Sequence, residues 1–178
     1  MTNLPILKKQ FWILFFKKNV FFWGLNHMQI EILNNNTPYA GDITPKTAWD
    51  VLSNETQSIL VDVRTKAELN FVGFPDLSII NKSAQNIEQQ FFPGGIINDD
   101  FVKTLENNLN EMNLSKDTPI LFLCRSGARS AKAATMMASN GWTRCFNIAY
   151  GFEGDPNEKH HRAYTNGWKF EGLPWIQL

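Results

Sequence analysis

Apolar residues in the middle of the chain fall into short runs separated by longer amphipathic segments. The runs "SILVDV" (58–63) and "PILFLC" (119–124) are almost wholly apolar, which is typical of strands covered on both faces. "RCFNIAYGFEG" (144–154) predicts the last strand and the exit from it. Because strands and helices alternate, we predict an α/β fold with a central, mostly parallel sheet of about five strands flanked by helices on both faces.

Two helix starts can be recognised from their capping residues. Thr44 and Pro45 place a hydroxyl cap and a proline at the first turn of a helix. The segment that follows carries apolar residues at helical spacing, namely Ala48, Val51 and Leu52. In "TKAE", Thr65 and Glu68 form a capping box, in which each side chain satisfies a free amide at the helix start.

Two later helices are predicted from their periodicity. "NDDFVKTLENNLNEMN" (98–113) has acidic residues expected in its first turn and one apolar stripe, made of Phe101, Leu105, Leu109 and Met112. The segment after "CRSGARS" repeats small residues on one face, which lets a helix lie close to a sheet, and Gly141 ends it. Those small residues are Ala131, Ala134 and Ala138.

The amino-terminal segment fits neither a membrane-spanning helix nor a secretory signal. In "KKQFWILFFKKNVFFWGL" (8–25) the longest apolar run covers the six residues 11–16, whereas a spanning helix needs about twenty. Its lysines do not gather on one helical face, as they would in a helix that lies on a membrane surface. We therefore favour a disordered segment over a weakly membrane-associated one. We therefore assign residues 1–36 to an extension and residues 37–178, including the C-terminal tail, to one domain.

Composition excludes several classes of function. The 17 basic and 17 acidic side chains cancel, which removes the general attraction that a nucleic-acid-binding protein needs. Two cysteines in 178 residues do not make a disulfide framework or a paired zinc motif, so we expect a reducing, cytoplasmic location and neither metal nor cofactor. His160 and His161 lie in a polar stretch without a third candidate ligand, and we expect them in a solvated tail.

The stretch "CRSGARS" (124–130) carries the most specific chemistry in the chain. It follows a predicted buried strand and opens a helix, so its backbone amides and the helix dipole favour an anion. We expect these groups to stabilise the Cys124 thiolate as a solvent-accessible nucleophile. The residues expected to bind an anionic substrate are Arg125, Ser126, Gly127, Ala128, Arg129 and Ser130.

Other polar residues have a structural interpretation. Arg129 either braces the loop or binds substrate, and both roles stay open. Asp62 and Arg64 are expected to form a supporting pair, because a buried charge needs a partner, and Glu68 is expected to act mainly as a cap. Cys145 lies inside the last predicted strand, where packing is favoured over a role as a second reactive thiol.

These residues resemble the single-domain rhodaneses, a family of sulfurtransferases, over residues 43–150. In that family a strand ending in cysteine leads into a six-residue loop like 124–129, and the cysteine carries a persulfide. "VDVRTKAEL" (61–69) is similar to the second family signature, and "GFEGD", "GWK" and "GLPW" look like the tail of a bacterial subgroup. The resemblance therefore implies a rhodanese-like fold.

The length of the loop separates two chemistries. Cysteine phosphatases and arsenate reductases need an arginine six positions after the cysteine, and that position here is Ser130. Arg129 comes one position earlier, so we expect a smaller cradle suited to one sulfur atom on Cys124. A phosphatase activity is disfavoured for this reason.

The resulting prediction is a sulfurtransferase. It moves a sulfane sulfur from thiosulfate or a similar small anionic donor to cyanide, a thiol or a protein thiol through a persulfide on Cys124. A persulfide carrier or a non-enzymatic module that binds a protein partner is the alternative. The aromatic stretch "QQFFPGG" (89–95) is expected to form one wall of the site and to select the acceptor.

Overall fold

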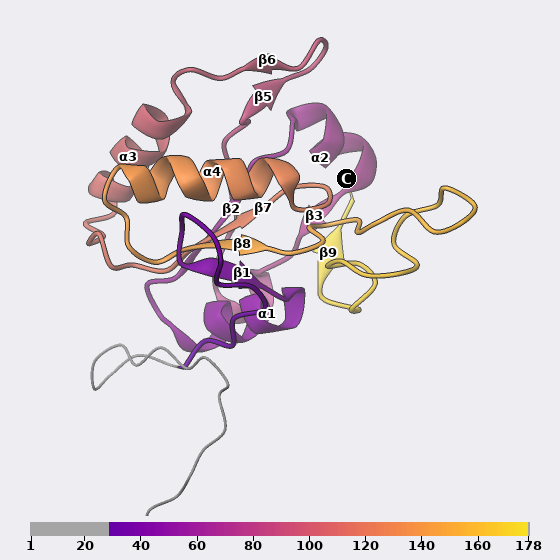
Figure 1. The fold of residues 1–178 in the computed structure, drawn as a ribbon, viewed down its shortest axis with the longest axis horizontal. Helices are drawn as coiled ribbons and strands as arrows, with labels where there is room; N and C mark the ends of the chain where they lie inside the picture. The colour runs from indigo at the N-terminus through magenta and orange to yellow at the C-terminus, as the bar shows by residue number, and fades with distance from the viewer. Residues whose placement is uncertain (1–28, 178) are drawn as a thin grey trace, which may run out of the picture.

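Five parallel strands form the central sheet in the computed structural model, which describes residues 29–177 (Figure 1). The strands are β1 (Gly41–Ile43), β2 (Ile59–Asp62), β4 (Gln85–Asn86), β7 (Ile120–Leu123) and β8 (Cys145–Ile148). Their order in the sheet is β1-β8-β7-β2-β4, and every neighbouring pair is parallel. The predicted α/β class and the parallel sheet are confirmed.

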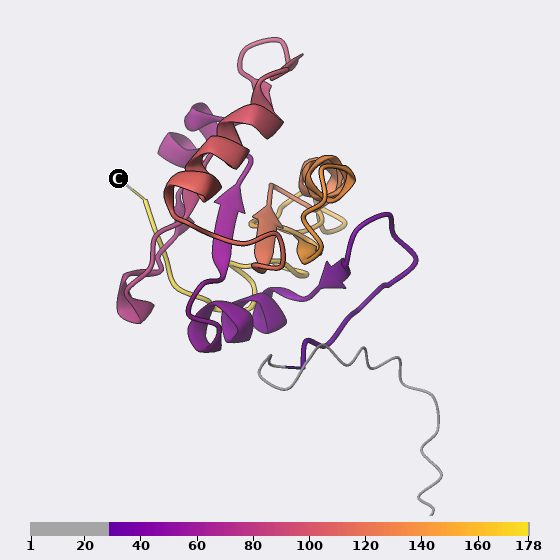
Figure 2. The same ribbon diagram turned by 90° about the vertical axis from the view of Figure 1, so that its left-hand side faces the viewer.

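Helices cover both faces of this sheet. Helices α3 (Phe101–Glu111) and α4 (Ala128–Ser139) pack on one face, and α1 (Pro45–Asn54) packs on the other (Figure 2). Because side chains alternate along a strand, Ile59 and Val61 of β2 face α3 and α4, while Leu60 faces α1. All four residues of β2 are buried, as the apolar run predicts.

The predicted caps are present. The Thr44 hydroxyl accepts a hydrogen bond from the Thr47 amide, and Pro45 is the first residue of α1. Helix α2 (Lys66–Val72) begins with the complete capping box of Thr65 and Glu68. These local signals depend on residues three positions apart, which explains why the sequence alone reveals them.

Details of two helices differ from the prediction. No acidic residue lies in the first turn of α3, because Asn98 forms the preceding turn and Asp100 stands at the cap without a side-chain hydrogen bond. Met112 lies just beyond the end of α3 and is 51% exposed, so it does not continue the apolar stripe. In α4 the buried face is rotated from the predicted one and consists of Ser130, Ala133, Ala134 and Met137.

Short strands outside the main sheet complete the fold. Strand β8 is not the last strand, because β9 (Trp175–Ile176) in the tail pairs with β3 (Phe74–Pro75) in antiparallel orientation. Strands β5 (Gln90–Phe91) and β6 (Ile96–Ile97) form a separate hairpin, and a 3₁₀ turn, η1, covers Ser78–Ile80. Two-residue strands leave no periodic pattern in a sequence, so the sequence did not predict them.

The predicted extension lies mostly outside the described residues, since 1–28 are not part of them. Within residues 29–36, Ile30 and Ile32 pack against the core on the α1 face. The Leu33 amide donates to the Asp42 carbonyl oxygen at 2.8 Å, which ties this segment to β1. None of the helices among residues 29–177 has the length and apolar character needed to cross a lipid bilayer.

Candidate active site

Cys124 directly follows β7, and its sulfur receives two polar contacts from the loop that leads into α4. The Gly127 amide donates to the Cys124 Sγ at 3.1 Å. The Ser130 Oγ lies 3.2 Å from Sγ and 3.0 Å from the Gly127 carbonyl oxygen, so its single proton can serve either acceptor. Gly127 has φ of 106°, a conformation that favours glycine, and it is the residue that caps α4. The loop thus directs an amide and a hydroxyl at one sulfur atom.

The expectation that Cys124 is open to solvent is wrong for this conformation. The residue is only 1% exposed and belongs to the core cluster on the α3 and α4 face. The Gly127 amide and the Ser130 hydroxyl contact the buried sulfur. A reagent therefore reaches Sγ only when covering atoms move aside, which sets a structural requirement on any reaction at this thiol.

The turn after β8 holds the backbone of the loop in place. The Phe152 amide donates to the Cys124 carbonyl oxygen at 2.7 Å, and the Glu153 amide donates to that of Arg125 at 2.9 Å. Gly151 makes this approach possible, because a Cβ at this position would lie 2.3 Å from the Cys124 carbonyl oxygen. The sequence does not predict this support, and its only signal there is the glycine that follows the last apolar run, in "AYGFEG".

Arg129 braces the loop through an ion pair with helix α2. Its Nη1 donates to Glu68 Oε2 at 2.8 Å and its Nη2 to Oε1 at 2.6 Å. Burial acts to raise the pKa of Glu68, but hydrogen bonds from Arg129 and from the Thr65 amide outweigh it and lower that pKa to about 2. Glu68 is therefore more than a cap, since it also anchors the end of the loop. The two guanidinium nitrogens of Arg129 already contact a carboxylate.

The other loop residues lie at the surface or near it. Arg125 and Ala128 are exposed, and Ser126 is half-buried. Arg125 makes no ion pair within residues 29–177. Of the two loop arginines, Arg125 is thus the one whose charge faces solvent.

Asp62 and Arg64 form the expected buried pair. The Arg64 Nη2 lies 2.5 Å from Asp62 Oδ2, and both side chains are almost completely buried. The same guanidinium donates to the Gly73 carbonyl oxygen at 3.0 Å and stacks 4.1 Å from the centre of the Phe152 ring. The pair therefore connects β2, the end of α2 and the turn that supports the loop.

Cys145 and the two histidines have no part in this arrangement. Cys145 is completely buried, and burial raises the pKa of its thiol to about 12, which agrees with a packing role. His160 and His161 are exposed. Within the described part of the chain, no group of three His, Cys, Asp or Glu residues could hold a metal ion.

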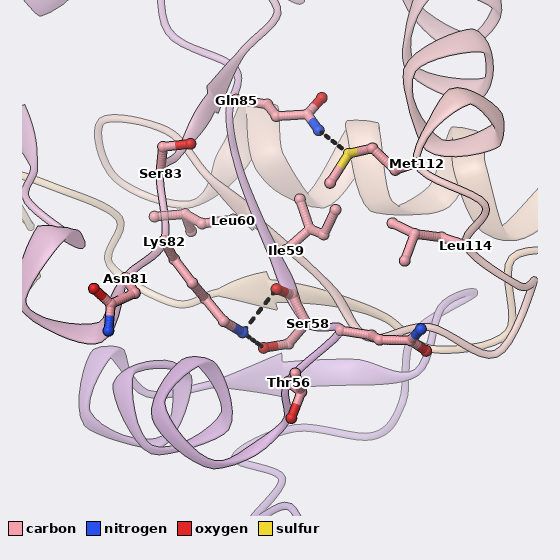
Figure 3. A pocket seen from close by; sticks show the side chains of 11 residues that line it. Thr56, Ser58, Ile59, Leu60, Asn81, Lys82, Ser83, Gln85, Met112 and Leu114 are labelled. Carbon is pink, nitrogen blue, oxygen red and sulfur yellow. Dashed lines mark hydrogen bonds between the residues drawn. The ribbon is translucent and has the colours of Figure 1, made fainter.

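A cavity of about 630 Å³ lies at the opposite end of the sheet (Figure 3). It is lined by residues near the start of β2 and the end of α3, among them Ser58, Ile59, Lys82 and Met112. The Lys82 ammonium donates to the Ser58 Oγ at 2.7 Å and to the Ser58 carbonyl oxygen at 3.0 Å. None of the loop residues 124–130 lines this cavity.

Most of this chain matches one family profile, and the same part is similar to several known proteins. The family profile described as "STR4 middle domain" matches residues 40–178. The uncharacterised protein RP600 of Rickettsia prowazekii is 38% identical over 134 residues, which cover 75% of this chain and 95% of RP600. The chloroplastic rhodanese-like domain-containing protein 4 of Arabidopsis thaliana is 26% identical over 151 residues, covering 83% of this chain and 28% of that protein. The crystal structure of Rv0390 from M. tuberculosis is 41% identical, covers 79% of this chain and 99% of its own, and superimposes with a TM-score of 0.70.

Proposed function

The chain belongs to the STR4 middle-domain family and is similar to a rhodanese-like domain-containing protein, and on that premise we propose that it is a sulfurtransferase acting through Cys124. One observation carries the proposal. The Gly127 amide and the Ser130 hydroxyl lie 3.1 Å and 3.2 Å from the same sulfur atom, at the start of a helix. Two hydrogen-bond donors and a helix dipole stabilise negative charge on that sulfur.

The first half of the reaction loads the cysteine. Once the atoms that cover Sγ have moved aside, the Cys124 thiolate attacks the outer sulfur of thiosulfate or a similar donor and forms a new S–S bond. The S–S bond of thiosulfate breaks, and sulfite leaves with the electron pair. The outer sulfur remains on Cys124 as an anionic persulfide, so the total charge is unchanged.

The second half of the reaction transfers the sulfur from Cys124 to an acceptor. Cyanide or a thiolate attacks the outer sulfur of the persulfide, the bond between the two sulfurs breaks, and Cys124 leaves as the thiolate. With cyanide the product is thiocyanate. Donor and acceptor bind in turn, so the kinetics should be ping-pong.

Arg125 is the residue we assign to the anionic end of the donor. Arg125 follows Cys124 in the loop and is exposed, whereas Arg129 is engaged by Glu68 through two hydrogen bonds. Arg129 then contributes by fixing the loop rather than by contacting the donor. The position of Ser130, where a cysteine phosphatase has its arginine, supports sulfur over phosphate as the transferred group.

A persulfide carrier or a non-enzymatic binding module is the second candidate. A carrier would hold the same sulfur on Cys124 but would receive it from another protein.

Both cysteines are free thiols, which suits a reducing compartment such as the cytoplasm.

Mass spectrometry after incubation with thiosulfate tests the proposal. We expect one added sulfur atom on Cys124, no addition in Cys124→Ser, and an unchanged result in the matched control Cys145→Ser. Turnover with cyanide then separates the enzyme from a carrier. A wild-type chain that folds and gains no sulfur from thiosulfate would refute the thiosulfate-dependent sulfurtransferase and favour the binding module.

A further inference from the structure

The hairpin of β5 and β6, residues 90–97, presents an apolar surface to solvent. Its large side chains are 41% exposed at Phe91, 71% at Phe92, 67% at Ile96 and 50% at Ile97. In both views the hairpin projects beyond the rest of the described chain (Figures 1 and 2). Four such side chains lie within seven consecutive positions, and Phe91 pairs with Ile96 across the hairpin, whereas single exposed apolar residues are ordinary.

The hairpin is held in a defined shape by its own hydrogen bonds. The Gly95 amide donates to the Phe91 carbonyl oxygen, and the Asn98 amide donates to the Gln89 carbonyl oxygen, both at 3.0 Å. The Asn98 side-chain amide donates to the Glu88 carbonyl oxygen at 2.8 Å. A partner that binds this patch therefore meets a surface that is already ordered, which lowers the entropy cost of binding.

The base of the hairpin is close to the candidate active site. The Gln89 amide donates to the Val63 carbonyl oxygen at 3.1 Å, and the Val63 amide donates to that of Leu123, next to Cys124, at 2.8 Å. Neighbouring strands lie about 4.8 Å apart, so Gln89 is about 10 Å from the backbone at Cys124. Phe92 lies three residues further along, about another 10 Å at the rise of a strand. A molecule bound at the hairpin therefore lies within about 20 Å of Cys124, and it reaches the thiol once the atoms that cover Sγ move aside.

Charge around the base of the hairpin indicates what kind of surface fits it. Glu88, Asp99 and Asp100 flank the hairpin, against Lys66 and Lys103 in the first turns of the adjacent helices. Asp99 and Asp100 are exposed directly behind the hairpin, and these two carboxylates disfavour an anionic membrane surface and favour a partner whose apolar patch is bordered by lysine or arginine.

We propose that this hairpin binds the sulfur acceptor, a protein that carries its cysteine beside an apolar patch with a basic border. The inference rests on the proposed function and extends it, because it names the class of acceptor for the persulfide on Cys124. Four apolar side chains are few compared with the roughly 20–30 residues that each partner contributes to a stable interface, which suits a brief encounter followed by release. The acceptor thiolate then attacks the outer sulfur as described for a small thiol.

The test uses cysteine peptides as defined acceptors. The first peptide carries a Lys-Leu-Phe-Lys segment about six residues from its cysteine, since six extended residues span about 20 Å. A second replaces Leu and Phe by Ser, and a third replaces both Lys by Glu. We expect the full-length protein to transfer sulfur to the first peptide with a kcat/KM about tenfold higher than to either of the others.

A hairpin variant and a matched control complete the experiment. Ile96→Ser with Ile97→Ser should lower the preference for the first peptide over the one without Leu and Phe, and should leave the rate with cyanide unchanged. Ile79→Ser, which removes another apolar side chain that is 68% exposed, should keep the preference.

The possible outcomes separate this inference from the proposed function. Normal cyanide turnover without any preference among the peptides overturns the hairpin proposal alone, while failure to form a persulfide overturns both. Sedimentation with vesicles of phosphatidylcholine and phosphatidylglycerol that is lost in the hairpin variant would also overturn it, in favour of membrane binding.

Discussion

Replacing Glu68 by glutamine removes the charge that anchors Arg129 and keeps the length of the side chain. The pKa of Glu68 falls from 4.5 to about 2 on folding, because hydrogen bonds from Arg129 and Thr65 outweigh the effect of burial. At about 1.4 kcal/mol for each pKa unit, this shift corresponds to about 3 kcal/mol. Arg129 and Glu68 keep 16% and 21% exposure, so solvent screening reduces the expected loss in Glu68→Gln to about 1.5 kcal/mol.

The pH dependence follows from the direction of the shift. A carboxyl group whose pKa is lowered on folding stabilises the protein fully above its unfolded pKa, here 4.5, and loses that contribution as the pH falls toward 2. The wild type should therefore exceed Glu68→Gln in stability by a constant amount between pH 7 and pH 5. The difference should then shrink steadily at lower pH.

Urea denaturation followed by fluorescence measures both effects. At a slope of about 2 kcal/mol/M, the midpoint at pH 7 should fall by about 0.7 M in Glu68→Gln. Glu171→Gln is the matched control, because Glu171 pairs with the exposed Lys46 at 2.7 Å and should change stability by less than about 0.5 kcal/mol. Equal midpoints for wild type and Glu68→Gln at pH 7, or a difference that persists undiminished at pH 3, would refute the reasoning.

Three further predictions concern the loop and the second cysteine. Ser130→Ala removes the hydroxyl 3.2 Å from the sulfur, and since a hydrogen bond to a charged group contributes about 1.5–3 kcal/mol, stopped-flow measurements should show persulfide formation on Cys124 slowed at least tenfold. An unchanged rate would exclude this hydroxyl from stabilising the thiolate. Gly151→Ala places a Cβ 2.3 Å from a backbone oxygen and should cost more than about 2 kcal/mol in urea denaturation, whereas Gly141→Ala meets no atom within 4 Å and should cost about 1 kcal/mol from its backbone conformation alone. Equal losses would argue against close packing at Gly151. Iodoacetamide at pH 8 should leave Cys145 unmodified in the folded protein, because its pKa is raised to about 12, and peptide mapping should detect its modification only after unfolding.

The parts of the fold that the sequence predicts are those with a strong local pattern. Strands β2 and β7 could be predicted because each is a continuous apolar run, and the cap at Thr65 because its partner is three residues away. The strands β4 and β9 have two residues each, so their pairing depends on contacts with distant parts of the chain.

In the candidate site, too, the sequence predicts the local features but not the contacts between distant residues. The loop and its cysteine stand out as a contiguous motif, whereas the bond between Arg129 and Glu68 joins residues 61 positions apart. A capping pattern reveals Glu68 but not its second partner. The burial of Cys124 also escaped the sequence, because a loop residue is covered or open according to how the surrounding elements pack.

The C-terminal tail completes the end of helix α2. The carbonyl oxygens of Phe71 and Val72 accept hydrogen bonds from the side chains of Gln177 and Lys169, at 3.0 Å and 2.8 Å. Because the same helix carries Glu68, a polypeptide fused directly behind the tail would begin next to the element that anchors the reactive loop.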